Sequence, residues 1–277
     1  MDAVVHPMAV VERGAIVGPG CQIGPFSNIG PDVSLLENVV VGSHVVIGGR
    51  TEIGSGTVIQ AFASIGQPPQ NIRHRGDSTR LVIGERNSIH EYVTMHVGTV
   101  DGGGITRIGN DGMFMVGAHV AHDCIVGDHV VMVNYSSVGG HCVVGNHVTI
   151  GAHAGIHQRL RIGNGAIVGG LAAVVRDVIP FGTVYGDRAS LHGLNFKGLE
   201  RQGFARDDRN RLYAAFKSVF DPNGIIQEGA KSVLEQDGDH PLVRELAEFV
   251  LTSKVRGLCT PDHSDPTGRF RAGGEPD

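Results

Sequence analysis

Residues 120–156 read VAHDCIVGDHVVMVNYSSVGGHCVVGNHVTIGAHAGI, and every sixth residue of this stretch is a valine, isoleucine or methionine. The same spacing of apolar residues, which we call anchors, runs through residues 5–65, 83–95 and 108–174. Glycine often follows an anchor, and a small or apolar residue stands four positions after it. A six-residue period fits neither an α-helix nor an alternating strand. It predicts a solenoid of short strands, in which the anchors fill the interior and glycine permits the bends.

The composition fits a solenoid better than a globular domain. Glycine accounts for 42 of 277 residues, tryptophan is absent and aromatic residues make up 5%. Such a chain has too few bulky side chains for a wide core, whereas stacked layers of Val and Ile supply a narrow, continuous one. A net charge of −5 and a pI near 6.3 give no sign of nucleic-acid binding.

Nothing in the sequence predicts secretion or membrane insertion. The first residues lack a basic region followed by a long apolar run, and polar residues or glycine interrupt every hexad. The four cysteines show no C-x-x-C spacing. We therefore expect a reduced, cytoplasmic protein without a transmembrane segment.

The pattern along the chain divides it into three regions. Residues 1–190 form the solenoid domain, residues 191–258 have the apolar spacing of short helices, and residues 259–277 have the Pro and Gly content of a flexible tail. The anchor series is interrupted twice, which predicts loops at 67–82 and 96–107. Long loops on a rigid scaffold are common positions for functional residues.

The six-residue period does not by itself say how many strands make one turn of the solenoid. Repeats of an aliphatic residue, glycine and a small residue in this order resemble the hexapeptide-repeat acyltransferases. That resemblance implies a left-handed parallel β-helix with three hexads in each triangular coil, against the usual right-handed crossover. The expected fold is therefore mainly β, a left-handed β-helix followed by a small C-terminal α-helical domain.

With three hexads per coil, every third anchor stacks on one edge of the prism. Both predicted loops leave the edge that carries Ile65 and Met95. Five histidines fall on that same edge, namely His96, His119, His122, His141 and His157. Clustered imidazoles supply a general base near neutral pH and donors for a polar substrate. Four other histidines share one slot of the hexad on other edges, where we expect solvated corner residues: His44, His129, His147 and His153.

The pair His122–Asp123 is the strongest candidate for chemistry on this edge. A neighbouring carboxylate can orient one ring nitrogen of a histidine and stabilise its cationic form. Gly140 lies one coil further along, where its backbone N–H could approach a developing oxyanion. The three residues together predict a general base, its orienting partner and a donor for an oxyanion.

Six segments of the sequence resemble the UDP-N-acetylglucosamine 3-O-acyltransferase family, over about His6 to Gly257: residues 67–80, 96–104, 119–124, 140–141, 156–158 and 193–195. The resemblance implies transfer of a (R)-3-hydroxyacyl chain from acyl carrier protein to the 3-position of UDP-N-acetylglucosamine, the first step of lipid A biosynthesis. It also implies a homotrimer with active sites between subunits, and neither metal nor cofactor.

The resemblance also carries roles over to individual residues. It makes His122 the general base, Asp123 its orienting partner and Gly140 the oxyanion donor. The positions that it places around the substrate are Asn71, Arg73, His96, His119, His141, His157, Gln158, Asn195 and Arg201. It makes Gly170 the residue that limits the acyl channel, and glycine there predicts a long chain, roughly C12–C14.

Three positions depart from the family pattern. Asn71 replaces an expected aspartate, Lys197 an expected glutamate and Gln202 an expected arginine. The change at Asn71 leaves open a 3-amino sugar as the acceptor. Basic residues outnumber acidic ones between Lys197 and Lys217, which suits either an acidic carrier protein or an ordinary solvated helix face.

Two other classes of protein also have to be weighed. A trimeric, zinc-dependent enzyme resembling carbonic anhydrase would use histidines between subunits as metal ligands. A structural or adhesive solenoid would have no reason to gather histidines on one edge. The His122–Asp123 pair and the helical region favour the acyltransferase over both.

Overall fold

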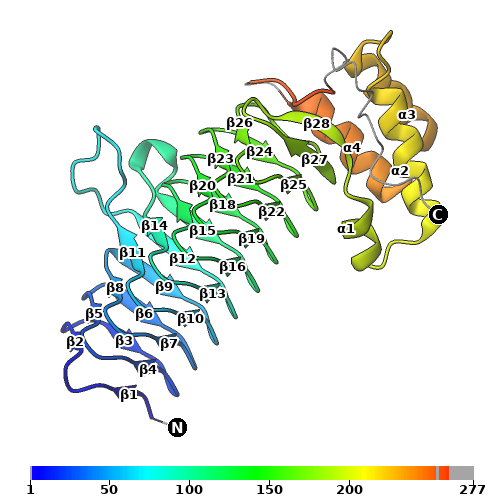
Figure 1. The fold of residues 1–277 in the computed structure, drawn as a ribbon. Coiled ribbons are helices and arrows are strands. Elements are labelled where there is room, and N and C mark those ends of the chain that lie inside the picture. The colour runs from blue at the N-terminus through cyan, green and yellow to red at the C-terminus, as the bar shows by residue number, and fades with distance from the viewer. Residues whose placement is uncertain (1, 254–255, 262–277) are drawn as a thin grey trace.

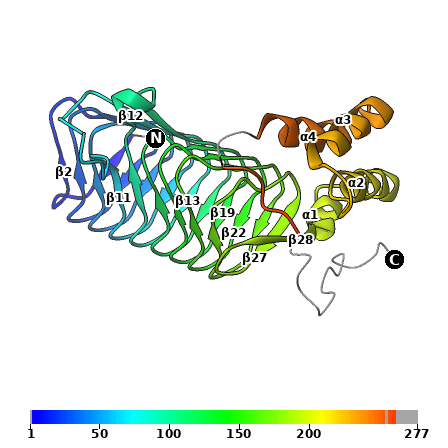
Figure 2. The same ribbon diagram turned by 90° about the horizontal axis from the view of Figure 1, so that it is seen from above.

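The computed structural model describes residues 2–253 and 256–261. Short strands stack into a long triangular prism, and four helices lie at the end of the prism away from the N-terminus (Figure 1). Seen from above, the coils follow one another along a single axis (Figure 2). The expected left-handed parallel β-helix with a C-terminal helical region is confirmed. Most of the predicted tail, residues 262–277, lies outside the described residues.

Three sheets form the faces of the prism, and their strands are parallel except for the last strand of the first sheet. The first contains β1 (Val4–Val5), β4 (Gln22–Ile23), β7 (Val40–Val41), β10 (Val58–Ile59), β13 (Ser88–Ile89), β16 (Met113–Phe114), β19 (Val131–Met132), β22 (Thr149–Ile150), β25 (Ile167–Val168), β27 (Gly182–Tyr185) and β28 (Ser190–Leu194). The second contains β2 (Val10–Val11), β5 (Asn28–Ile29), β8 (Val46–Ile47), β11 (Ser64–Gln67), β14 (Thr94–His96), β17 (His119–Val120), β20 (Ser137–Val138), β23 (Gly155–Ile156) and β26 (Ala173–Val174). The third contains β3 (Ile16–Val17), β6 (Val33–Leu35), β9 (Arg50–Ile53), β12 (Arg80–Ile83), β15 (Ile105–Ile108), β18 (Ile125–Val126), β21 (Val143–Val144) and β24 (Arg161–Ile162).

The register of the second sheet matches the predicted column of anchors. Ile65 pairs with Met95, Met95 with Val120, Val120 with Val138 and Val138 with Ile156. These anchors are almost fully buried, so the interior of the prism is one continuous stack of aliphatic side chains. Burial of this stack is the main source of stability in a fold with so few aromatic residues.

The corners of the prism depend on a left-handed backbone conformation. The residue three positions after an anchor commonly has a positive φ, as at Asp123 (60°) and His141 (61°). Asp, Asn and His tolerate this conformation better than other residues with a side chain. The four histidines predicted at solvated corners are exposed and have positive φ: His44, His129, His147 and His153.

Both loops are shorter than predicted because the strands beside them continue to pair. β11 extends to Gln67 and β12 begins at Arg80, which leaves residues 68–79 as the first loop. The second loop spans 97–104, between β14 and β15, and contains a 3-10 turn at Val100–Gly102.

The helices are α1 (Phe196–Arg201), α2 (Arg206–Val219), α3 (Ile226–Asp237) and α4 (Pro241–Thr252). Strand structure continues to Leu194 because β28 pairs antiparallel with β27, so the change to helix falls beyond the predicted boundary at 190. Among the described residues, no helix combines the length and apolarity needed to span a bilayer.

The predicted flexible tail begins too early, at 259. Leu258 and Cys259 are buried, and the Cys259 N–H donates to the Asp177 carbonyl at 2.8 Å. The Leu191 N–H donates to the Thr260 carbonyl at 3.0 Å. Residues 259–261 therefore pack against the end of the solenoid.

Candidate active site

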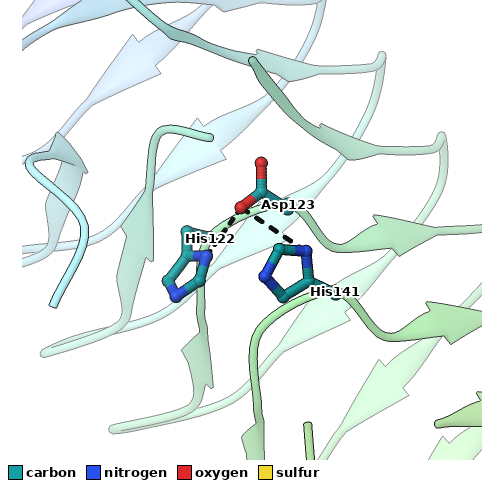
Figure 3. A group of neighbouring side chains, drawn as sticks. All are labelled: His122, Asp123 and His141. Carbon is teal, nitrogen blue, oxygen red and sulfur yellow. Dashed lines mark hydrogen bonds and ion pairs between the residues drawn. The ribbon is translucent and has the colours of Figure 1, made fainter. Parts of the chain in front are cut away.

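His122 and Asp123 occupy the corner that follows β17. The Nδ1 atom of His122 lies 2.7 Å from Oδ2 of Asp123 (Figure 3). A carboxylate only accepts hydrogen bonds, so Nδ1 carries a proton, and in the neutral ring Nε2 then keeps its lone pair. The pair is therefore arranged for proton abstraction by Nε2.

The carboxylate of Asp123 is held from its other side by Thr99 in the second loop. The Thr99 N–H donates to Oδ1 at 2.8 Å, and its hydroxyl donates to Oδ2 at 2.6 Å. The backbone N–H of Asp123 donates to the hydroxyl of Thr106 at 2.8 Å. The Asp123 side chain is 1% exposed, so these contacts replace solvent around a buried charge.

The sequence pattern predicts no role for Thr99 or Thr106. Both fall inside the second predicted loop, where the six-residue period stops. The only indication in the sequence that Thr99 has a function is that it lies within the segment 96–104, which resembles the family.

Gly140 lies beside His122, at the equivalent position of the next coil. A Cβ atom on Gly140 would stand 2.8 Å from Cε1 and 2.9 Å from Nε2 of His122, so glycine is required there for space. The N–H of Gly140 has no acceptor among the described residues. That free donor beside the imidazole is what an oxyanion site needs.

His141 follows Gly140 and points toward the same carboxylate (Figure 3). Its Nδ1 lies 3.7 Å from Oδ2 of Asp123, and its ring is perpendicular to that of His122 at 5.1 Å between centroids. Burial lowers the pKa of His141 below its usual value, although the Asp123 charge opposes this. His141 is therefore a neutral, polar neighbour of His122 at neutral pH.

His96 and His119 lie on adjacent strands of the second sheet, with ring centroids 5.1 Å apart. Burial, with smaller effects from His119 and His122, lowers the pKa of His96 to about 4, and burial also lowers the pKa of His119. Nδ1 of His119 lies 2.7 Å from the Thr94 hydroxyl. Nδ1 of His96 is buried and has no hydrogen-bond partner among the described residues. Both rings are thus uncharged at neutral pH.

The remaining predicted positions of this edge are more exposed. His157 and Gln158 follow Ile156 on the next coil after Gly140, and Nδ1 of His157 lies 3.2 Å from the Gln158 carbonyl. Asn71 and Arg73 belong to the first loop, where the Asn71 side chain accepts the Arg73 N–H at 2.9 Å. They line a cleft of about 260 Å³ between the two loops, together with Thr99.

Three predicted residues lie apart from His122 within one chain. Asn195 begins α1, where its side chain accepts the Gly198 N–H at 2.8 Å and donates to the Gly165 carbonyl at 2.9 Å. Arg201 ends that helix. Gly170 stands at a corner after the first sheet, whereas His122 stands at a corner after the second. One chain therefore does not bring these residues to the base.

The side chains of His122, Asp123 and His141 are close enough to be considered as metal ligands. Ligand atoms around a tetrahedral zinc ion stand about 3.3 Å apart, because each lies about 2.0–2.2 Å from the metal. Nδ1 of His122 and Oδ2 of Asp123 are separated by 2.7 Å, which is a direct hydrogen bond. These three side chains therefore do not form a zinc site as they are arranged within one chain.

Comparison with known proteins places this site in a class. Residues 14–49 match the family model described as bacterial transferase hexapeptide (six repeats), so the solenoid is that of a hexapeptide-repeat transferase. Residues 177–259 match the model described as UDP N-acetylglucosamine O-acyltransferase, domain 2.

Individual relatives narrow the class to one family. The acyl-(acyl-carrier-protein)–UDP-N-acetylglucosamine O-acyltransferase of Caulobacter vibrioides is 52% identical over 75% of this chain and 79% of its own length. The protein of the same name from Rhizobium etli is 42% identical over 94% of this chain and 95% of its own. The solved UDP-N-acetylglucosamine acyltransferase from Campylobacter jejuni superposes with a TM-score of 0.88 at 33% identity, covering 93% of this chain and 100% of that one. The chain belongs to the acyl-(acyl-carrier-protein)–UDP-N-acetylglucosamine O-acyltransferase family.

Proposed function

We propose that this protein transfers a (R)-3-hydroxyacyl group from acyl carrier protein to the 3-hydroxyl of UDP-N-acetylglucosamine, the first step of lipid A biosynthesis. The observation that carries the proposal is the chain of hydrogen bonds from Thr99 through Asp123 to His122, beside the unpartnered N–H of Gly140. Family membership supplies the donor and the acceptor.

The chemistry follows from the proton positions in the site. Nε2 of His122 takes the proton of the sugar 3-hydroxyl as that oxygen attacks the thioester carbonyl carbon. The imidazolium that forms is stabilised by Asp123, 2.7 Å from Nδ1. The carbonyl oxygen becomes an oxyanion and accepts the Gly140 N–H. Collapse of the tetrahedral intermediate breaks the carbon–sulfur bond, and His122 returns the proton to the carrier thiolate.

The neutral histidines suit the binding of a sugar nucleotide around this base. Because burial holds His96 and His119 uncharged, each ring has one donor and one acceptor nitrogen, and in His119 Nδ1 is already bonded to the Thr94 hydroxyl. Positively charged neighbours would repel the His122 imidazolium, whereas uncharged ones do not oppose its formation. We assign His96, His119, His141, His157 and Gln158 to the substrate-lining positions.

A homotrimer with sites between subunits is part of the proposal. Asn195, Arg201 and Gly170 can assist His122 only if a second copy supplies them, since one chain keeps them apart. An apolar ridge for such a contact runs along the corner after the first sheet, where exposed rings stack at 4.8 to 5.4 Å. These rings belong to Phe26, His44, Phe62, Tyr92, Tyr135 and His153. Exposed apolar ridges of this kind are typical of subunit interfaces.

The helical region gives weaker support for docking of an acidic carrier protein than the excess of basic residues in its sequence does. Arg211 pairs with Asp237, and Arg209 lies 3.9 Å from Glu200. These internal pairs leave fewer unpaired basic side chains in the segment between Lys197 and Lys217. The carrier protein remains the proposed donor through family membership.

The test is a transfer assay with UDP-N-acetylglucosamine and hydroxyacyl carrier proteins, with the product identified by mass spectrometry. His122→Ala should lower kcat by at least the 10²–10⁴-fold typical of a lost general base. His147→Ala is the matched control, because that ring is exposed at a corner and stacks on His129. Activity of His122→Ala above about a tenth of the wild type would contradict the assignment.

Two further measurements test the sharing of sites between subunits and the identity of the acceptor sugar. Mixed trimers of inactive His122→Ala and inactive Arg201→Ala chains should regain activity if sites form between subunits, whereas no recovery would contradict shared sites. The relatives are named O-acyltransferases, which favours the hydroxyl acceptor over the 3-amino analogue. Faster acylation of the amino sugar under matched conditions would reverse that choice.

A further inference from the structure

Thr99 is the point where the second loop meets the candidate active site. It is 6% exposed, and it donates through its N–H to one oxygen of Asp123 and through its hydroxyl to the other. Two donors on two oxygens fix the plane of the carboxylate, whereas a single donor would leave it free to rotate. Oδ2, which His122 also contacts, is therefore held in place from the loop.

The loop itself is built to hold Thr99 in position. The N–H groups of Gly102 and Gly104 both donate to the Thr99 carbonyl, at 3.1 and 2.8 Å. A Cβ atom on Gly102 would overlap the carboxylate of Asp123, so glycine lets the loop lie directly on it. The loop thus closes around Thr99 and covers Asp123 from solvent.

We propose that Thr99 is a positioning residue for the reaction, which sets the orientation of the His122 base by fixing both oxygens of Asp123. The proposal rests on the assignment of His122 as the base under the proposed function. It makes the second loop part of the catalytic apparatus and gives a reason for the interruption of the repeat at this coil.

Thr99 also connects the base to the cleft between the loops. Thr99 lines the same cleft as Asn71, Arg73 and Asp101. A ligand in that cleft would contact the residue that holds Asp123, so its binding and the alignment of His122 would be coupled through Thr99.

The electrostatic surroundings of the base give the proposal a readout that a purely structural role lacks. The ionisable groups that act on His122 are Asp123 on its own turn, His141 on the next coil, and His119 and His96 on the adjoining strands, with Arg159 acting on His141. The Thr99 hydroxyl withdraws part of the Asp123 charge by donating to it. Without that donor, the carboxylate stabilises the His122 cation more strongly, and the acid limb of the kcat/KM profile moves to higher pH.

The test compares Thr99→Val with Thr99→Ser. Valine removes the hydroxyl at nearly constant shape and keeps the backbone N–H, and kcat should fall by about 10- to 100-fold, the effect of one hydrogen bond to a charged group. The acid limb should move to higher pH in the same variant. Thr99→Ser keeps a hydroxyl and should restore both the rate and the position of the limb. Thr99→Ala is a second variant without the hydroxyl, in case valine disturbs folding.

Thr106→Val is the matched control for the pH readout. Its hydroxyl accepts the backbone N–H of Asp123 and does not contact the carboxylate, so the acid limb should stay in place. Thr99 variants that melt earlier but keep the wild-type kcat and acid limb would overturn the proposal and leave Thr99 a structural residue. Failure of the base assignment is a different result, since it requires His122→Ala to retain activity.

Discussion

Gly140→Ala is the most direct test of how closely the backbone approaches the base. The substitution adds one methyl group and leaves the Gly140 N–H in place. The backbone of Gly140 does not have the left-handed conformation, so alanine introduces no strain in φ. Its effect should therefore come from contact with His122.

The size of the effect follows from the contact distances. The new Cβ would lie 2.8 Å from Cε1 of His122, and an ordinary contact begins at 3.4 Å. The imidazole must therefore retreat by roughly 0.6 Å while its Nδ1 is tied to Asp123. Displacement of a catalytic group by about 1 Å can cost 10²-fold in rate. We expect kcat to fall by roughly 10- to 100-fold, with a smaller change in KM.

Gly155→Ala is the matched control for this substitution. Gly155 lies in β23 of the same sheet, and the nearest atom to an added Cβ is the Ser137 hydroxyl oxygen at 3.8 Å. Steady-state kinetics and melting curves should show Gly155→Ala close to the wild type in both. Full activity in Gly140→Ala, with an intact fold, would refute the proximity of Gly140 to the working base.

Three other outcomes follow from the structure. The pKa of His96 in the folded protein, about 4, lies below its usual value of 6.5, so the unfolded chain binds more protons between these two pH values. The melting temperature should therefore fall as the pH drops from 6.5 to about 4. In His96→Asn the melting temperature should fall by less over the same range. Gly170→Met should shift kcat/KM toward acyl donors several carbons shorter. The fold should survive, because an added Cβ meets only the Ala152 carbonyl oxygen at 3.3 Å and the Ala152 nitrogen at 3.8 Å. An unchanged ranking of C10, C12 and C14 donors would show that Gly170 does not limit the acyl channel. Arg161→Ala should loosen α4 from the solenoid, because Arg161 donates to Asp177, Thr252 and the Phe249 carbonyl. Proteolysis of the helical region should then be faster in Arg161→Ala than in the control Arg176→Ala.

The repeat could be predicted in detail because its period is strict. The period fixes the anchors within each uninterrupted run. Three hexads per coil, taken from the family resemblance, then pair Ile65 with Met95, Met95 with Val120 and Val120 with Val138. The histidines beside that column followed from the same count. A shift of one residue in the assumed register would have turned every anchor outward. The burial of the anchors is therefore a stringent test of the predicted register.

The contacts of the loops and the chain end could not be read in this way. Thr99 and Thr106 lie where the period is interrupted, and no spacing rule connects them to Asp123. The packing of Cys259 against Asp177 joins residues far apart in sequence after the pattern has ended. Asn195 carries an internal role at the start of α1 that the family resemblance does not include. Each of these depends on tertiary contacts between irregular segments.

The contrast between two histidines of the same fold shows what the loops contribute. His129 follows Asp128, so it too has a carboxylate next to it in sequence. The Asp128 carboxylate accepts the backbone and side-chain N–H groups of Asn110, and His129 stacks on His147 at an exposed corner. At His122, by contrast, the carboxylate is turned toward the ring and covered, because Thr99 reaches it from outside the repeat. A regular coil can place an acid beside a histidine, but it is the interruption of the coil that brings Thr99 onto the carboxylate and holds it against the ring of His122.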